Sequence, residues 1–509
     1  MDPSIDGRQT DRPSRYTAPN GRRHSLWALM LFTILFCSAA VPAWSQAMTD
    51  DAIQRAVTSQ LMKDNYIQAQ RIDVTVKDGI VTLSGTVDRL ITSERAADVA
   101  MIVKGVRAIV NRLAVMPASR SDQEIRDDVR TALELDPVAD TAEIEIAFRD
   151  GRVTLTGRVD SWQEKQLVEI PVKRIHGVRE VVNDLTVDVP SHRSDEEIAA
   201  EINQRLAWDV WVAASRISVE VVDGRVALSG VVGSLAEKQK AAAAVWVSGV
   251  RSVDDDALAV DWQRYQTHLR SRPRKQYTDA SIVQAVQAVL RHDPRISPAA
   301  EIDVIAESGV VTLQGNVTLL AAARAAEADA RNTAGVWMVK NLVKVRPAIG
   351  PDYRPMPDAG SEMARNVRLA LLLTPGVRQD AVTVTVNQSI AMLEGQVSSN
   401  FARRRAGDAA AGIRGVVTVV NRLQVVTEPV QADREDWQIR HDIESELRWS
   451  PFVDDKDVHI EVVDGTAVLT GVVEDLRARR AATVNAREGG ARTVKNHLKV
   501  RHGPDFLRP

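Results

Sequence analysis

The chain has 509 residues, which is too long for one hydrophobic core and indicates several domains. Its formal net charge is −3, and a weakly acidic chain excludes a general role in binding nucleic acid. The only cysteine is Cys37, near the N-terminus, so the rest of the chain offers no disulfide, thiol nucleophile or cysteine-ligated metal.

The N-terminal segment has the pattern of an export signal. Arg22 and Arg23 precede an apolar run over Leu26–Val41, and small residues follow up to Ala47. This order predicts a signal peptide over residues 1–47, cleaved after Ala47. The apolar run is shorter than the roughly 20 residues that span a bilayer, and a retained anchor is the alternative. We expect a soluble periplasmic product, exported by either the general or the twin-arginine route.

An amphipathic helix follows the signal. Thr49 or Asp50 is its predicted N-cap, and Ile53, Val57 and Leu61 then form one apolar stripe at intervals of four residues. The stripe returns five times, at Ile125/Val129/Leu133, Ile198/Ile202/Leu206, Ile282/Val286/Leu290, Met363/Val367/Leu371 and Ile439/Ile443/Leu447.

A β-hairpin is predicted next. Apolar and polar residues alternate over Ile72–Lys77 and again over Val81–Val87, so one face of the sheet is expected to be apolar and the other polar and solvent-exposed. Asp78–Gly79 between them is a dipeptide favoured in two-residue hairpin turns.

The returning strand contains a glycine that interrupts its apolar set. A glycine inside a strand marks a bulge or the close approach of another backbone. Because it recurs in every repeat, we expect a helix to cross the sheet there. The six strand glycines are Gly85, Gly157, Gly230, Gly315, Gly395 and Gly471.

A second helix and a final strand complete the unit. The helix is expected over about Thr92–Lys104, ended by Gly105 in the left-handed conformation, and the strand over Val106–Val115. Asn111 in this strand is expected to bond a neighbouring loop or turn, with ligand binding as the alternative. The second glycine recurs at Gly177, Gly249, Gly335, Gly415 and Gly490, and the asparagine position holds Asn183, Asp255, Asn341, Asn421 and Asn496.

Repetition of these elements at roughly 70–85 residues predicts an array of like modules. Each is a small α+β fold in the order helix–strand–strand–helix–strand, with a three-stranded mixed sheet and two helices on one face. The predicted modules 1 to 6 span residues 49–116, 121–189, 194–260, 278–346, 361–427 and 434–501. A basic linker over 261–277 and a Pro-rich spacer over 347–360 separate some of them.

The repeated motif resembles the BON domain of bacterial osmotically inducible and nodulation proteins. The resemblance rests on LSGTV at 83–87 with GVRAIVNRL at 105–113, and on LTGRV at 155–159 with GVREVVNDL at 177–185. Further matches are LSGVV at 228–232, LQGNV at 313–317, LEGQV at 393–397 and LTGVV at 469–473. The resemblance implies a periplasmic or envelope-associated binding protein, linked to phospholipid membranes, envelope integrity and osmotic stress, and not an enzyme.

Three modules depart from the motif. Module 5 turns through Asn387–Ser389 without glycine, so a looser hairpin is expected. In module 3, Asp255 lies in an acidic run, and the last strand is expected to fray. In module 2, Pro171 lies within the second helix, which predicts a kink or a shifted boundary.

The linker over 261–277 is one candidate contact with anionic lipid. Basic side chains are attracted to anionic leaflets, and tryptophan favours the headgroup zone. The alternative is a solvated hinge whose rings pack on module 3. The candidate residues are Trp262, Arg264, Arg270, Arg272, Arg274 and Lys275.

A second candidate is the loop after the first helix. This place holds Trp208 and Trp211 in module 3, and Trp449 and Phe452 in module 6. Lipid contact is one reading. Packing at the end of the core is the other, because Trp208 and Trp449 each follow the last stripe leucine by two residues.

The sequence contains no HExxH pair, nucleophile elbow or phosphate-binding loop, so no catalytic, metal or cofactor residues are assigned. The expected partner is anionic phospholipid or another envelope surface. A scaffold for other envelope proteins is the second hypothesis, and ion or osmolyte sensing is a third.

Overall fold

The computed structural model describes residues 48–64, 67–116, 120–139, 144–187, 193–264, 277–297, 300–347, 359–374, 376–378, 381–398, 400–426, 434–474 and 476–501. The predicted signal peptide lies outside these residues. So do Arg270, Arg272, Arg274 and Lys275 of the linker and most of the Pro-rich spacer.

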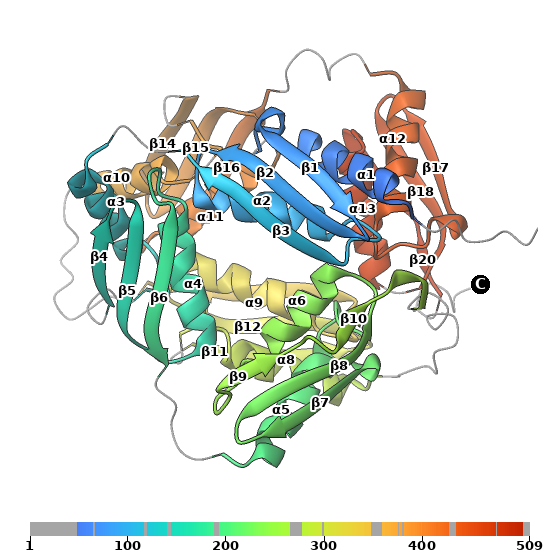
Figure 1. Cartoon of the computed structure of the whole chain (residues 1–509). Coiled ribbons are helices and arrows are strands. Elements are labelled where there is room, and N and C mark those ends of the chain that lie inside the picture. The colour runs from blue at the N-terminus through green and yellow to red at the C-terminus, as the bar shows by residue number, and fades with distance from the viewer. Residues whose placement is uncertain are drawn as a thin grey trace, which may run out of the picture. The chain divides into compact units, whose positions relative to one another are not determined.

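Module 1 has the predicted fold. Helix α1 (Asp50–Lys63) precedes strands β1 (Ile72–Lys77) and β2 (Ile80–Val87), and helix α2 (Leu90–Met101) precedes β3 (Ala108–Val115). Strand β2 is central, antiparallel to β1 and parallel to β3. Both helices lie on one face of this mixed sheet (Figure 1).

Modules 2 and 3 repeat this order. Module 2 consists of α3 (Asp122–Glu134), β4 (Ile144–Arg149), β5 (Arg152–Val159), α4 (Trp162–Lys173) and β6 (Glu180–Val187). Module 3 consists of α5 (Asp195–Trp208), β7 (Ile217–Val222), β8 (Arg225–Val232), α6 (Leu235–Ala244), β9 (Ser252–Asp254) and β10 (Leu258–Val260).

Modules 4 to 6 follow the same plan. Module 4 consists of α8 (Asp279–Arg291), β11 (Glu301–Glu307), β12 (Val310–Val317), α9 (Leu320–Asn332) and β13 (Met338–Val345). Module 5 consists of α10 (Ala359–Leu372), β14 (Val382–Asn387), β15 (Ile390–Val397), α11 (Asn400–Ala411) and β16 (Thr418–Val425). Module 6 consists of α12 (Asp436–Trp449), β17 (Val458–Val463), β18 (Thr466–Val473), α13 (Leu476–Glu488), β19 (Thr493–Asn496) and β20 (Lys499–Val500).

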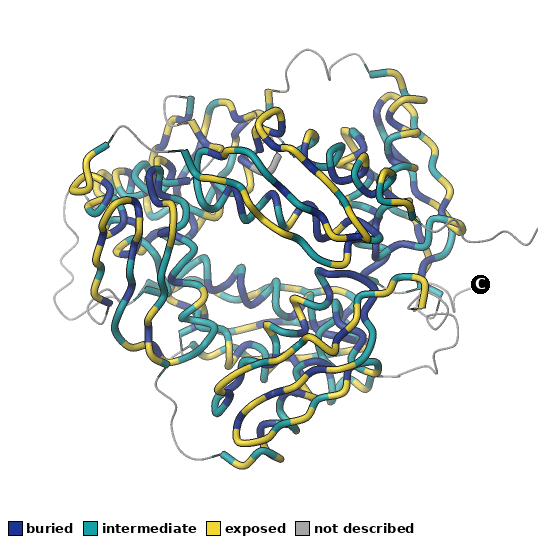
Figure 2. Tube along the Cα trace, in the orientation of Figure 1, coloured by how far each residue is buried: buried dark blue, intermediate teal, exposed yellow. Residues whose placement is uncertain are grey.

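Each module closes its own core between sheet and helices. The stripe residues Ile53, Val57 and Leu61 are at most 2% exposed and pack with Val81 and Leu83 of β2. Each sheet consists of strands from one module, so no strand is exchanged between modules among the described residues. Burial alternates along the strands (Figure 2), which leaves the outer sheet face exposed.

The start of the first helix also holds the hairpin turn. Thr49 is the N-cap, and its side chain accepts a hydrogen bond from the Ala52 N–H. The Asp50 carboxylate accepts bonds from the N–H groups of Asp78 and Gly79, at 2.7 and 2.9 Å. The equivalent carboxylates of Asp195, Asp279 and Asp436 bind their own hairpin turns in the same way.

The strand glycine admits a backbone carbonyl at the start of the neighbouring strand, so another backbone does come close, but the expected crossing of the sheet by one of the two α-helices is wrong. A Cβ atom at Gly85 would lie 2.0 Å from the carbonyl oxygen of Arg71, immediately before β1. Its φ of 121° is also one that residues with a side chain rarely adopt. The same close approach occurs at Gly230, Gly315, Gly395 and Gly471.

The second helix ends earlier than predicted. It ends at Met101 instead of Lys104, and Gly105 lies in the turn that follows, with φ of 90°. Gly105 therefore does not end the helix. A Cβ atom there would lie 2.8 Å from Cδ1 of Ile53, so the glycine allows α1 to approach this turn.

The recurring asparagine joins the last strand to the second helix. The Asn111 side-chain N–H donates to the carbonyl oxygen of Ser93 in α2 at 3.1 Å, and its oxygen accepts from Leu113 N–H at 3.1 Å. The structural role is as expected, but the partner is a helix and not a loop or turn. Asn183, Asn341, Asn421 and Asn496 make the same pair of bonds.

Module 3 shows the expected interruption of its last strand. Asp255 lies in the break between β9 and β10, with its carboxylate 3.6 Å from Lys238 Nζ. The acid is not required for such a break, because β19 and β20 of module 6 are also separated although Asn496 keeps its bonds.

The hairpin of module 5 and the helix boundary in module 2 do not change as expected. In module 5, Asn387 still pairs with Ile390, so the hairpin is not looser; Gln388 and Ser389 adopt φ of 46° and 64°. In module 2, α4 continues through Pro171 to Lys173 and has the same length, 12 residues, as α2. Its boundary is therefore not shifted.

We expect Gly395→Ala to destabilise module 5 by about 3 kcal/mol or more, because it combines a steric clash with an unfavourable φ. Its Cβ atom would lie 2.0 Å from the carbonyl oxygen of Ala381. Hydrogen exchange of the β14–β16 peptides measures this opening.

The matched control is Gly412→Ala in the same module, where the nearest atom to the new Cβ would be 3.5 Å away. We expect this control to change stability by less than about 1 kcal/mol. Equal exchange in the two variants would contradict the role assigned to the strand glycine.

Candidate functional site

Contacts between modules are made by helices and by the turns that follow them. The Lys63 ammonium of α1 pairs with the Glu446 carboxylate of α12, and Lys173 of α4 lies 2.7 Å from Glu94 of α2. Arg324 of α9 donates to the carbonyl oxygen of Gly407 in α11 at 3.0 Å. The inner helical layer of one module thus packs on that of another.

Modules 1 and 6 meet around a buried lysine. The Lys104 N–H donates to the carbonyl oxygen of Trp449 at 3.1 Å, and its ammonium donates to the Val453 carbonyl oxygen at 3.2 Å. The ammonium also lies 4.8 Å from the ring centre of Trp262. Burial lowers the pKa of Lys104 to about 8, despite the opposing charges of Asp455 and Asp454.

The structure places the predicted aromatic residues between modules. The Trp211 ring lies edge-on to Phe452 at 5.1 Å, and its indole N–H donates to the Asn332 side-chain oxygen at 3.3 Å. Trp449 packs against the core of module 1. These rings are half-buried, and packing between modules is a role that neither sequence interpretation included.

The linker residues are only partly described. Trp262 contacts Lys104 of module 1, a contact that neither interpretation of the linker included. The Arg264 residue is exposed, and its backbone N–H donates to the Asp261 carboxylate at 3.0 Å.

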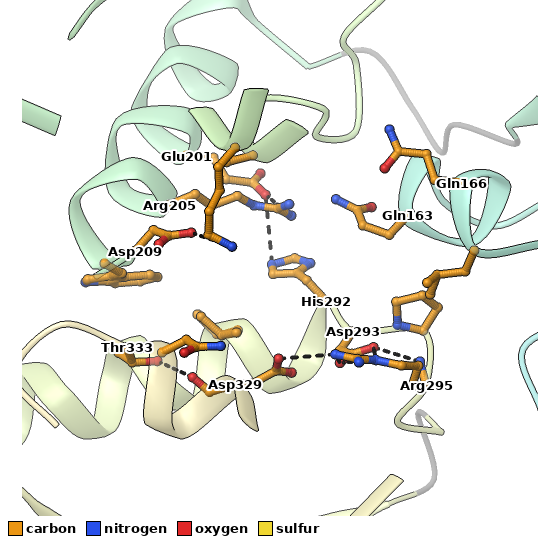
Figure 3. A pocket seen from close by; sticks show the side chains of 18 of the residues that line it. Gln163, Gln166, Glu201, Arg205, Asp209, His292, Asp293, Arg295, Asp329 and Thr333 are labelled. Carbon is orange, nitrogen blue, oxygen red and sulfur yellow. Dashed lines mark hydrogen bonds and ion pairs between the residues drawn. The ribbon is translucent and has the colours of Figure 1, made fainter. Parts of the chain in front are cut away.

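A cavity of about 510 Å³ lies where modules 2, 3 and 4 meet (Figure 3). Helix α4 contributes Gln163 and Gln166, α5 contributes Glu201 and Trp208, and α6 contributes Lys240. Helix α5 and its C-cap also contribute Gln204, Arg205 and Asp209. The end of α8, helix α9 and the residues that follow these helices contribute His292, Asp293, Arg295, Asp329, Asn332 and Thr333. Apart from Trp208, the sequence interpretation assigned no role to these residues, because nothing in one repeat shows which helices meet.

Ion pairs fix the polar side chains of the cavity wall. Arg205 lies 2.7 Å from Glu201, Lys240 lies 3.5 Å from Asp209, and Arg295 lies 2.5 Å from Asp293. A fourth carboxyl group, Asp329, lies 3.3 Å from Arg295, so four carboxyl groups face three cations and the wall is balanced when one carboxyl group is protonated.

Asp329 and Asp293 form a carboxyl pair in this wall. Burial and the hydrogen bond with Asp293 raise the pKa of Asp329 to about 9. Burial opposes ionisation of Asp293, but the hydrogen bonds from Arg295 and Asp329 and the positive charge of Arg295 together outweigh it and lower the pKa of Asp293. The pair therefore shares one proton at neutral pH. Burial also lowers the pKa of His292, which favours its neutral form.

The described residues contain neither a metal-ligating group of three or more side chains nor a helix long and apolar enough to cross a bilayer. Residues 49–117, 121–189, 194–261, 278–347, 360–427 and 435–502 match the model of the BON domain. The chain belongs to the BON domain family.

Two curated relatives are similar to parts of the chain. Osmotically-inducible protein Y of Escherichia coli (strain K12) is 30% identical over 145 residues, which is 27% of this chain and 72% of that protein. Outer membrane lipoprotein DolP of Haemophilus influenzae (strain Rd) is 27% identical over 139 residues, which is 26% of this chain and 72% of that protein.

Among solved structures, the C-terminal domain of CdsD, a structural protein of the type III secretion system of Chlamydia trachomatis, aligns with a TM-score of 0.12 and 16% identity. The alignment covers 44% of this chain and 99% of that domain.

The carboxyl pair predicts that the stability of module 4 depends on pH. Because the pKa of Asp329 is raised from 3.8 to about 9, the folded state holds a proton that the unfolded state loses. The contribution of Asp329 to stability is therefore fully present below about pH 4 and is lost as the pH rises towards 9. Asp329→Asn supplies a permanent N–H donor to Asp293, so we expect it to remove this fall and to stabilise α9 by about 1 kcal/mol or more at pH 8.

Hydrogen exchange of α9 peptides between pH 5 and 8, corrected for intrinsic rates, measures this effect. Asp303→Asn, on the exposed face of β11 in the same module, is the matched control. An unchanged pH slope in Asp329→Asn would show that the pair does not hold the proton.

Proposed function

We propose that this protein is a non-enzymatic, periplasmic envelope protein that binds phospholipid membranes through its repeated BON domains. In this role it supports envelope integrity or the response to osmotic stress. Membership of the BON family supports the proposal, as do similarities to an osmotically inducible protein and to an outer membrane lipoprotein.

The exposed sheet face of module 4 is the observation that carries the membrane assignment. Met338 and Leu342 of β13 are 54% and 56% exposed, and they alternate with the exposed Lys340 and Lys344. Ile305 of β11 adds a further exposed apolar side chain. The other exposed residues of β11, Glu301, Asp303 and Glu307, are acidic, so the basic part of this face is its β13 edge. Apolar side chains between lysines suit an anionic lipid surface, where each nearby lysine contributes about 1 kcal/mol.

The basic linker leads directly into module 4 in the sequence, and we propose that it acts together with the exposed face of this module. The five basic residues predicted from the sequence remain our candidate for additional lipid contact. The aromatic residues Trp211, Trp449 and Phe452 have less surface to offer, because they are half-buried at contacts between modules. Weak contacts on several modules of one chain add through effective concentration.

Vesicle co-sedimentation tests the proposal. We expect the protein to bind vesicles of phosphatidylglycerol and phosphatidylethanolamine at low salt, to bind less in high salt because of screening, and not to bind pure phosphatidylcholine. Lys340→Ser/Lys344→Ser should weaken binding about tenfold or more, and serine at all five basic linker positions should weaken it further.

Arg149→Ser/Arg152→Ser, which removes the same charge from exposed positions of module 2, is the matched control and should retain most of the binding. Absence of binding to anionic vesicles would overturn the proposal. An equal loss of vesicle binding in the control would show that the overall charge of the protein, and not the module 4 face, determines binding.

A scaffold for envelope proteins is the second candidate. It is favoured by the outer strands of the described sheets, which pair with no strand of another module and leave free backbone groups for a partner strand. Capture of a defined envelope protein without lipid binding would support this function instead.

A further inference from the structure

The cavity among modules 2, 3 and 4 has hydrogen-bonding capacity that the fold does not use. Gln166 of α4 and Gln204 of α5 line it from two different modules, and both are exposed. Among the described residues, neither amide has a hydrogen-bond partner in the protein. An amide offers a donor and an acceptor side by side, so it matches a ligand group that both donates and accepts.

The charge balance of the wall argues against a charged ligand. An anion would need a free cation, but Arg205, Lys240 and Arg295 each hold a carboxylate of the wall. A cation would need a free carboxylate, but Glu201, Asp209 and Asp293 are the partners in those same pairs. An electrically neutral ligand leaves all these pairs intact and avoids the cost of an unpaired charge.

Apolar side chains from three helices also line the cavity. Trp208, at the end of α5, lines it together with Leu167 and Ile170 of α4 and Val289 of α8. The volume of 510 Å³ lies within the range of about 300–1,000 Å³ that is usual for small-molecule sites. An indole ring can stack on a rigid ligand that has an apolar face and a polar rim.

Saccharides combine these properties. A sugar ring has a face of C–H groups that packs on an indole, and its hydroxyl groups donate and accept hydrogen bonds around the rim. It is neutral, and its hydroxyl groups suit both the free amides and the oxygens of paired carboxylates.

We propose that the cavity is a binding site for a neutral saccharide, stacked on Trp208 and held at the rim by Gln166 and Gln204. The site is separate from the proposed lipid surface on β13, so it stands whether or not the protein binds membranes.

Saturation-transfer NMR on the purified protein tests this site, with trehalose and N,N′-diacetylchitobiose as neutral probes and with choline and a phosphate monoester, glycerol 3-phosphate, as charged ones. We expect transfer to at least one of the two saccharides and none to choline or glycerol 3-phosphate. Gln166→Ala/Gln204→Ala should lower the saccharide affinity at least about fourfold, since each lost hydrogen bond is worth roughly two- to tenfold.

Trp208→Leu is the second variant and should abolish the transfer, while Gln424→Ala, an exposed amide on β16 of module 5, should leave it unchanged. Unchanged far-ultraviolet circular dichroism shows that the variants fold. The proposal is overturned if neither saccharide binds, if both site variants bind like the parent, or if choline or glycerol 3-phosphate binds in place of the saccharides.

Discussion

The small size of each module is the constraint on which the rest of this structure depends. A unit of fewer than about 70 residues buries only about 60% of its unfolded surface, so two helices and three strands close a core of modest size. Other modules supply additional apolar contacts. Leu235 of α6 is buried in the core of module 1, and Leu373 and Leu135 pack reciprocally between modules 2 and 5. Packing of helices on helices therefore stabilises the array and leaves the sheets to face outward.

This division of labour explains where binding surfaces arise. The larger contacts between modules among the described residues join helices and not outer sheet faces, and on module 4 the β13 edge of that face combines apolar side chains with lysines. The inner helices instead line a cavity where modules 2, 3 and 4 meet and their side chains do not fill the space. One kind of surface is suited to an extended partner such as a membrane, and the other to a small ligand.

The repeated elements could be predicted from the sequence because each depends on local rules. The stripe at Ile53, Val57 and Leu61 is buried as its spacing predicts, and Asp78–Gly79 forms the turn that its residue types favour. The strand glycine was also singled out correctly. Its partner was not, because an approaching carbonyl such as that of Arg71 leaves no mark on residue type.

Contacts between modules could not be predicted for a different reason. Trp211 and Phe452 are far apart in the sequence. From one repeat alone, each is expected either to pack at the end of its own module's core or to contact lipid. The choice between these readings depends on which helices meet, and that is set by packing across the whole chain. The polar residues of the cavity were missed for the same reason, since Asp293 and Asp329 resemble solvated helix residues when each repeat is read alone.

Zero-length carbodiimide cross-linking with peptide mass spectrometry tests the packing between modules most directly. Lys173 lies 2.6 Å from Glu169 within its own helix and 2.7 Å from Glu94 of module 1, so one lysine reports on both levels of structure. We predict that the monomeric fraction contains the 173–169 and 173–94 cross-links together, along with the 63–446 cross-link between modules 1 and 6. Cross-links confined to pairs within single modules would contradict the account, because the modules would then be independent beads.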